Sequence, residues 1–95
     1  MGVTHGPAQA GFTDGNELNE DCSGGTKGSF RSGACIGYVA GVVDADEGIG
    51  NCLPYGPKMG QIRDVVKQYL QDHPESRHYN ASSLVVIAVR EAFCK

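Results

Sequence analysis

Four cysteines are the residues of this chain whose type and spacing bear most directly on chemistry. They are Cys22, Cys35, Cys52 and Cys94 in a sequence of 95 residues. An even number of cysteines in a short chain is typical of a disulfide framework. Their wide spacing contains no C-x-x-C pair, which is the pattern of many zinc sites and redox motifs. We therefore expect two disulfides, with free buried thiols and a metal site as the alternatives.

Histidines and carboxylates are the other candidates for chemistry. His73 and His78 bracket the turn HPESRH, where they could hold a metal, although capping and solvent contact are commoner roles for such a pair. Asp44, Asp46 and Glu47 could serve as acid–base residues, or form a solvated segment that faces a basic partner. A catalytic Cys–His pair needs a free thiol, and the cysteines have structural uses. The sequence therefore predicts no active site, no cofactor and no metal.

Charge and hydropathy exclude two classes of partner. The net charge is −3, and the eight Lys and Arg residues form no basic run, which argues against nucleic acid. No apolar stretch reaches the roughly 20 residues that a membrane-spanning helix needs.

The first residues predict a separate tail. Residues 1–11 contain Gly and Pro and no apolar run, so we expect a disordered N-terminal tail and one domain over residues 12–95. This tail has neither the cationic nor the apolar region of a signal peptide. The chain is then either cytosolic or the mature part of an exported protein, and its cysteines favour export.

Apolar periodicity predicts four helices. Asp14 and Glu17 have capping-box spacing at the start of the first, and a second spans residues 30–45. Gly56 and Pro57 suit the start of a third helix that ends by His73. Asn80 is the expected cap of the fourth. The expected core positions are Leu18, Cys22, Cys35, Val39, Val42, Val43, Ile62, Val65, Val66, Tyr69, Leu70, Ala81, Leu84, Val85, Ala88, Val89, Ala92 and Phe93, with Tyr38 at the edge.

Two features within these helices call for an explanation. Gly33, Gly37 and Gly41 recur every four residues, although glycine costs a helix about 1 kcal/mol relative to alanine. We expect them to pack closely against the backbone of a neighbouring helix, because no Lys-Ser/Thr pair follows that would indicate a phosphate-binding loop. Val86 and Ile87 fall on the back of the last helix, where they indicate either a self-association face or ordinary surface residues.

Helix order predicts the disulfide pairing. Short connections favour an up-and-down four-helix bundle, which places Cys22 beside Cys35 at one pole and Cys52 beside Cys94 at the other. The two bridges would stabilise the fold by about 3 and about 4 kcal/mol in the chain-entropy model. The expected fold is an all-α four-helix bundle joined by two disulfides.

The sequence also resembles a known family. The run GACIGYVAGVVD (33–44) is similar to the G-x-C-x-G-Y-[IV]-x-G-[VI]-x-D signature of the Rap/Tai immunity proteins. The elements CLP (52–54), GQIRDVVKQYL (60–70), HPE (73–75) and AFC (92–94) follow in the family's order. There are two departures. Lys58 stands where the family has a Thr or Ser cap, and Cys94 follows Phe93 directly where the family has an intervening Pro.

The resemblance implies a periplasmic, all-helical protein without enzymatic activity, often a homodimer. Such a protein would neutralise a type VI secreted, NlpC/P60-like peptidoglycan amidase by occluding its substrate groove. For the homodimer, the exposed back of the last helix supplies candidate residues: Val86, Ile87 and Arg90. The alternative function is a periplasmic binding or stress-related helical module that has no cognate toxin.

An inhibitor of this kind needs a protruding segment that is held rigidly at its base. The connection over residues 46–55 is the longest expected between helices, and Cys52 would anchor it. Its expected partner contacts are Asp46, Glu47, Gly48, Ile49, Gly50, Asn51 and Leu53. An ordinary exposed connector is the alternative, and the turn at residues 75–79 is the competing protrusion.

Overall fold

A computed structural model describes residues 12–24, 28–53 and 56–94 of the chain, apart from the side chains of residues 28 and 29. The described residues form five α-helices and no β-strand. The elements in chain order are α1 (Gly15–Ser23), α2 (Gly28–Ala45), α3 (Glu47–Cys52), α4 (Met59–Asp72), the 3₁₀ helix η2 (Pro74–Ser76) and α5 (Ala81–Phe93). The all-α class predicted from the sequence is confirmed. The predicted tail over residues 1–11 lies outside the described residues.

Two helices begin at the side chains that the sequence predicts as caps. Asp14 Oδ1 accepts a hydrogen bond from the Glu17 amide at 2.9 Å, and Asn80 Oδ1 accepts one from the Ser82 amide at 3.3 Å. Each bond satisfies an amide that has no partner within its helix. An isolated bridge between Asp14 and Asn80 also brings these two helix starts together.

The start of α4 differs from the prediction. The helix begins at Met59 and not at Pro57, with Lys58 as its N-cap. Gln61 Oε1 accepts a hydrogen bond from the Lys58 amide at 2.9 Å, which is one half of a capping box. This hydrogen bond between the Lys58 amide and the Gln61 side chain stabilises the first turn. The Lys58 side chain has no hydrogen-bond acceptor, so the other bond of a capping box is not formed.

The segment expected to be a loop before Cys52 is a helix. Asp46 caps α3 by accepting from the Ile49 amide at 2.9 Å, and the Ile49 side chain is fully buried. The capping bond and the burial of Ile49 together stabilise this short helix by more than its two glycines destabilise it. The expectation of four helices is therefore wrong by one, since α3 adds a fifth.

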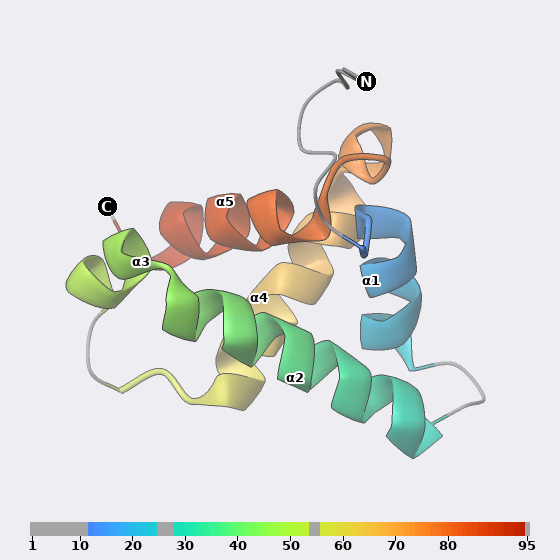
Figure 1. Cartoon of the computed structure of the whole chain (residues 1–95), viewed down its shortest axis with the longest axis horizontal. Helices are drawn as coiled ribbons and strands as arrows, with labels where there is room; N and C mark the ends of the chain where they lie inside the picture. Colours follow the sequence, from blue (N-terminus) through green and yellow to red (C-terminus); the bar gives the residue numbers. More distant parts are fainter. Residues whose placement is uncertain (1–11, 25–27, 54–55, 95) are drawn as a thin grey trace, which may run out of the picture.

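The helices cross one another rather than running up and down side by side (Figure 1). α2 spans the front of the molecule, α4 lies behind it, and α1 and α3 stand at opposite ends. The buried apolar side chains that fill the centre are Leu18, Cys22, Cys35, Val39, Ile49, Ile62, Val66, Leu70, Ala81, Leu84, Val85, Ala88 and Val89. The predicted core stripes are confirmed at these positions except Ile49, which was predicted as a partner contact, and Ala92 is exposed and was wrongly included in the core. No helix in the described part of the chain is long and apolar enough to cross a membrane.

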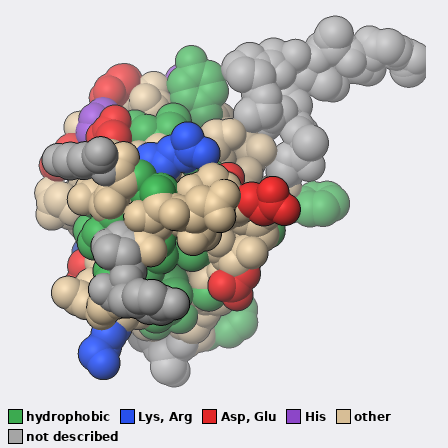
Figure 2. Space-filling view, turned by 90° about the vertical axis from the view of Figure 1, so that its left-hand side faces the viewer, with side chains coloured by type: hydrophobic (Ala, Val, Ile, Leu, Met, Phe, Trp, Pro, Cys, Tyr) green, Lys and Arg blue, Asp and Glu red, His purple; other side chains and the backbone are tan. Residues whose placement is uncertain are grey.

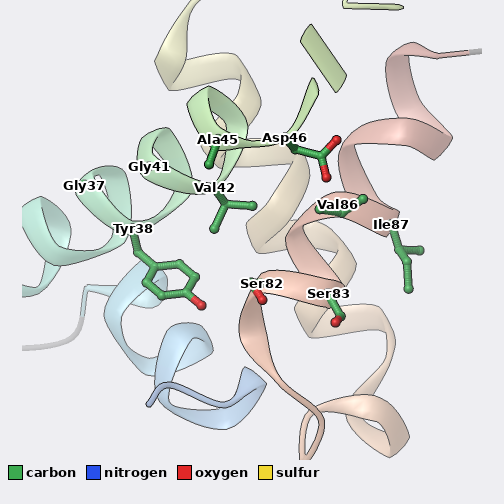
Figure 3. A pocket seen from close by; sticks show the side chains of 10 residues that line it. All are labelled: Gly37, Tyr38, Gly41, Val42, Ala45, Asp46, Ser82, Ser83, Val86 and Ile87. Atoms are coloured by element: carbon green, nitrogen blue, oxygen red, sulfur yellow. The ribbon is translucent and has the colours of Figure 1, made fainter. Parts of the chain in front are cut away.

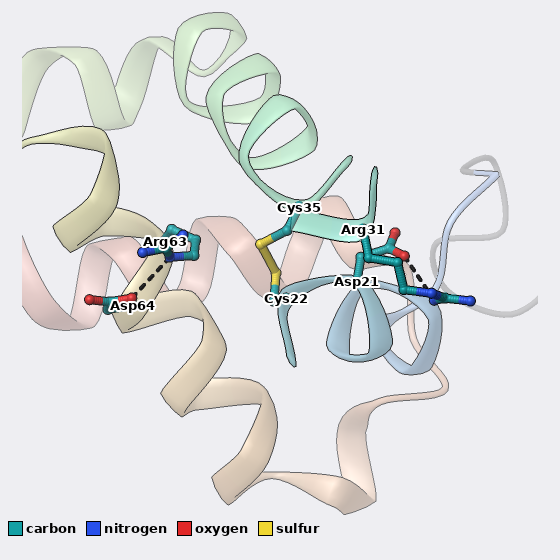
Figure 4. The surroundings of a disulfide bond; sticks show 6 residues. All are labelled: Asp21, Cys22, Arg31, Cys35, Arg63 and Asp64. Carbon is teal, nitrogen blue, oxygen red and sulfur yellow. Dashed lines mark hydrogen bonds and ion pairs between the residues drawn. A yellow bond between two sulfur atoms is a disulfide. The ribbon is translucent and has the colours of Figure 1, made fainter. Parts of the chain in front are cut away.

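Both predicted disulfides are present. Cys22 is joined to Cys35 with 4.9 Å between their Cα atoms, and Cys52 to Cys94 with 5.3 Å. The first bridge is buried between α1 and α2, beside an ion pair in which Arg31 Nη1 lies 3.0 Å from Asp21 Oδ1 (Figure 4). The second lies nearer the surface and fastens α3 to the end of α5.

Close packing occurs at a different glycine from those predicted. A Cβ atom built on Gly15 would lie 2.8 Å from both the Cα and the carbonyl oxygen of Arg77. At Gly33, Gly37 and Gly41 such an atom would meet no neighbour within 4 Å among the described residues. The predicted backbone contact of these three glycines is therefore wrong among the described residues, because they lie on the outer face of α2.

Substitution of Gly15 tests this assignment. Gly15→Ala should lower the free energy of unfolding by about 1–3 kcal/mol, because the added methyl group is too close to backbone that cannot move aside. Gly50→Ala is the matched control, since Gly50 is exposed and has open space around it. Chemical denaturation measures both. A Gly15→Ala protein as stable as the control would contradict the packing.

Candidate partner-binding surface

The segment predicted to bind a partner forms one end of the molecule. Glu47, Gly50 and Asn51 are exposed on α3, and the Cys52–Cys94 bridge holds the end of that helix. The view onto this end shows acidic and apolar side chains next to one another on the surface (Figure 2). The surface is therefore supported by helical backbone rather than by a loop. We call Glu47, Gly50 and Asn51 the α3 surface.

Two of the predicted contact residues face inward. The Ile49 side chain is fully buried and belongs to the core, so it is not free to contact a partner. Leu53 is half-buried and packs against the same core. The physical reason is helix formation: one helical turn directs the only large apolar side chain of α3 toward α5, and the polar residues outward.

Asp46 and Arg90 connect α3 with the last helix. Arg90 Nη2 lies 3.9 Å from Asp46 Oδ1, and the Arg90 guanidinium also covers Gly48, where a Cβ atom would collide with it. The Arg90 side chain is 54% exposed, so solvent weakens this ion pair. The structure thus places Arg90, predicted as a dimer residue, beside the predicted partner-binding segment.

A groove lies between α2 and α5, next to the α3 surface (Figure 3). Its volume is about 820 Å³. The residues that line it are Gly37, Tyr38, Gly41, Val42, Ala45, Asp46, Ser82, Ser83, Val86 and Ile87. Val86 and Ile87, predicted as dimer residues, form part of its α5 wall. The groove is mainly apolar, with hydroxyl groups toward one end and the Asp46 carboxylate at the other.

The polar groups of the groove suit binding rather than acid–base chemistry. Burial raises the pKa of Tyr38, and the nearby Ser82 opposes that shift without cancelling it. The phenol is therefore neutral at ordinary pH and can donate or accept a hydrogen bond. The Asp46 carboxylate already accepts the capping hydrogen bond of α3.

The histidines make local contacts. The Nδ1 atom of His73 lies 2.8 Å from the Tyr69 carbonyl oxygen, and its ring stacks on that of Tyr69. His78 stands against the ring of Tyr79. Within residues 12–24, 28–53 and 56–94, no three His, Cys, Asp or Glu side chains gather as metal ligands would.

Sequence reasoning missed the groove. Tyr38 was predicted only as an edge position, and Ser82 and Ser83 carried no signal of their own. The exposed Phe30 at the start of α2 was also missed. The glycine spacing on α2 was the available signal, because it marks a helix face without side chains.

Comparison with known proteins agrees with the resemblance seen in the sequence. The model of the Rap1a immunity protein family matches residues 14–94. The chain belongs to the Rap1a immunity proteins. No curated protein and no solved structure matches it. Membership of this family indicates an immunity role, which implies binding to a cognate effector.

The burial of Ile49 in this Rap1a family member gives a direct test of the α3 assignment. Ile49→Ala should lower the free energy of unfolding by about 2–5 kcal/mol, because it leaves a cavity under α3. Ile87→Ala is the matched control, because the Ile87 side chain is partly exposed and its truncation should cost much less. Thermal and chemical unfolding of both proteins provide the measurement. Equal, small effects would mean that Ile49 is a surface residue.

Proposed function

We propose that this protein binds and inhibits a type VI secreted peptidoglycan amidase of the NlpC/P60-like class in the periplasm. The α3 surface would occlude the substrate groove of the enzyme. The observation that carries the proposal is the fixation of α3: Asp46 caps its start, Ile49 anchors its middle and the Cys52–Cys94 bridge holds its end. An element held at three points loses little conformational entropy on binding.

The periplasm is proposed on the basis of redox chemistry. All the cysteines are paired, and disulfides persist in oxidising compartments such as the periplasm. The negative net charge and the exposed Glu47 favour a partner with basic residues around its groove. A homodimer is part of the proposal, because Val86 and Ile87 border a groove that the described residues leave open.

A charged and longer side chain introduced at position 51 tests whether the α3 surface binds the amidase. Asn51→Lys should weaken binding to the amidase by at least about tenfold, because a standard interface tolerates no unmatched long side chain near its centre. Asn16→Lys is the matched control, since Asn16 is also an exposed helical asparagine but lies on α1 at the opposite end of the molecule. Titration calorimetry with an NlpC/P60-like amidase effector measures both affinities.

Three outcomes separate the possibilities. Loss of affinity confined to Asn51→Lys supports the α3 surface. Equal, full-strength binding by both variants would exclude it and favour the turn at residues 75–79. The absence of binding by the unsubstituted protein would reject the amidase and leave the alternative of a periplasmic module without a toxin partner.

A further inference from the structure

The two disulfides differ in how far solvent reaches them. Cys22 and Cys35 are 7% and 0% exposed and belong to the core. Cys52 is exposed, and Cys94 is half-buried. Thiol–disulfide exchange begins when a thiolate attacks one of the two sulfur atoms, so its rate depends on access to them. The Cys52–Cys94 bridge is therefore the one that a reductant in solution can reach while the protein stays folded.

This accessible bridge holds the helix that is least able to persist alone. α3 has six residues, two of them glycine, and a helix of that length is unstable in water without tertiary contacts. Among the buried core side chains, Ile49 is the one that comes from α3, and the others come from α1, α2, α4 and α5. Release of α3 would therefore leave most of the core in place.

The other attachments of α3 are weaker than the bridge. The Asp46 cap is a local bond, which orders the first turn without tying it to another element. The Arg90–Asp46 pair spans 3.9 Å and is open to solvent. By contrast, the Cys94 amide donates a hydrogen bond to the Arg90 carbonyl oxygen at 2.9 Å, which fixes the far end of the bridge at the end of α5. The bridge thus connects α3 to a fixed point beside it (Figure 1).

We propose that the Cys52–Cys94 bridge is a redox switch for α3. A dithiol reductant opens it and releases α3, while the Cys22–Cys35 bridge and the other four α-helices stay folded. The dithiol is a small molecule or a protein whose two thiols can close to a disulfide.

The exchange takes place in two steps. One thiolate of the dithiol attacks Cys52 Sγ and forms a mixed disulfide, the original S–S bond breaks, and Cys94 leaves as a thiolate. The second thiolate of the dithiol then attacks its own partner sulfur in the mixed disulfide and displaces Cys52. The protein disulfide gains two electrons, the dithiol is oxidised to a disulfide, and its two protons end on the released thiols of Cys52 and Cys94.

The consequence for recognition rests on the proposed function. α3 carries the α3 surface, so a released α3 must be ordered again when the amidase binds. That ordering reduces the affinity by its entropic cost. The protein would then bind its effector tightly only where the bridge is oxidised, and a reduced chain would keep a folded core with little inhibitory activity.

Selective reduction is the first test. The protein is treated with dithiothreitol, samples are quenched with iodoacetamide at successive times, and mass spectrometry maps the alkylated cysteines. Cys52 and Cys94 should be alkylated at least about tenfold faster than Cys22 and Cys35, because the latter pair is enclosed by the core. Equal rates, or earlier alkylation of Cys22 and Cys35, would overturn the proposal.

Removal of the bridge is the second test. Replacing both cysteines, Cys52→Ser with Cys94→Ser, should leave one cooperative unfolding transition and speed hydrogen exchange of the α3 amides by about tenfold or more, with the amides of α4 still slow. Cys22→Ser with Cys35→Ser is the matched control, since it removes the bridge that does not touch α3. It should not speed α3 exchange relative to the other helices.

Two results from these variants would contradict the switch. Slow α3 exchange without the bridge would mean that the bridge does not hold the helix. A protein that unfolds throughout when this bridge is removed by substitution, or opened by dithiothreitol, would make it a link that the whole fold requires.

Affinity measurements separate the switch from the proposed function. Titration of the oxidised protein and of the Cys52→Ser, Cys94→Ser variant with an NlpC/P60-like amidase effector should give at least about tenfold weaker binding by the variant. Equal affinities would overturn the redox control of recognition. An oxidised protein that binds no amidase would reject the proposed function, whereas release of α3, which is measured on the free protein, would stand.

Discussion

The Cys52–Cys94 bridge joins a helix of six residues to the end of the last helix of the fold. A helix of that length is far below what is stable alone in water. It persists because the bridge, the Asp46 cap and the buried Ile49 side chain act on its end, start and middle. The position of α3 therefore depends on long-range covalent and apolar contacts rather than on its own helical propensity.

The other bridge has a different role. Cys22 and Cys35 lie within the core, where they connect α1 to α2 and limit the freedom of the unfolded chain. A small domain has little apolar surface to bury, so its disulfides supply part of the stability that a larger core would provide.

Local patterns in the sequence were enough to locate four of the helices and their caps at Asp14 and Asn80, because these features depend on short-range spacing. Both disulfide pairings were predicted from the order of the helices, and they are correct although the helices cross rather than run up and down. α3 was missed because six residues with two glycines and one large apolar side chain carry no measurable period. The glycines of α2 were assigned to close packing against a neighbouring helix, but spacing alone does not tell which face of a helix has a neighbour, and none lies beside them among the described residues. Ile49 was placed on the surface for the same reason that α3 was missed.

The proposed role of α3 is that of a rigid recognition element of an immunity protein. Hydrogen–deuterium exchange of the oxidised protein, alone and with an NlpC/P60-like amidase effector, tests that role most directly. We expect slow exchange of the α3 amides in the free protein, because the helix is held at both ends, and still slower exchange at residues 46–53 in the complex. Fast exchange of α3 in the free protein, or protection in the complex confined to α1, would contradict it.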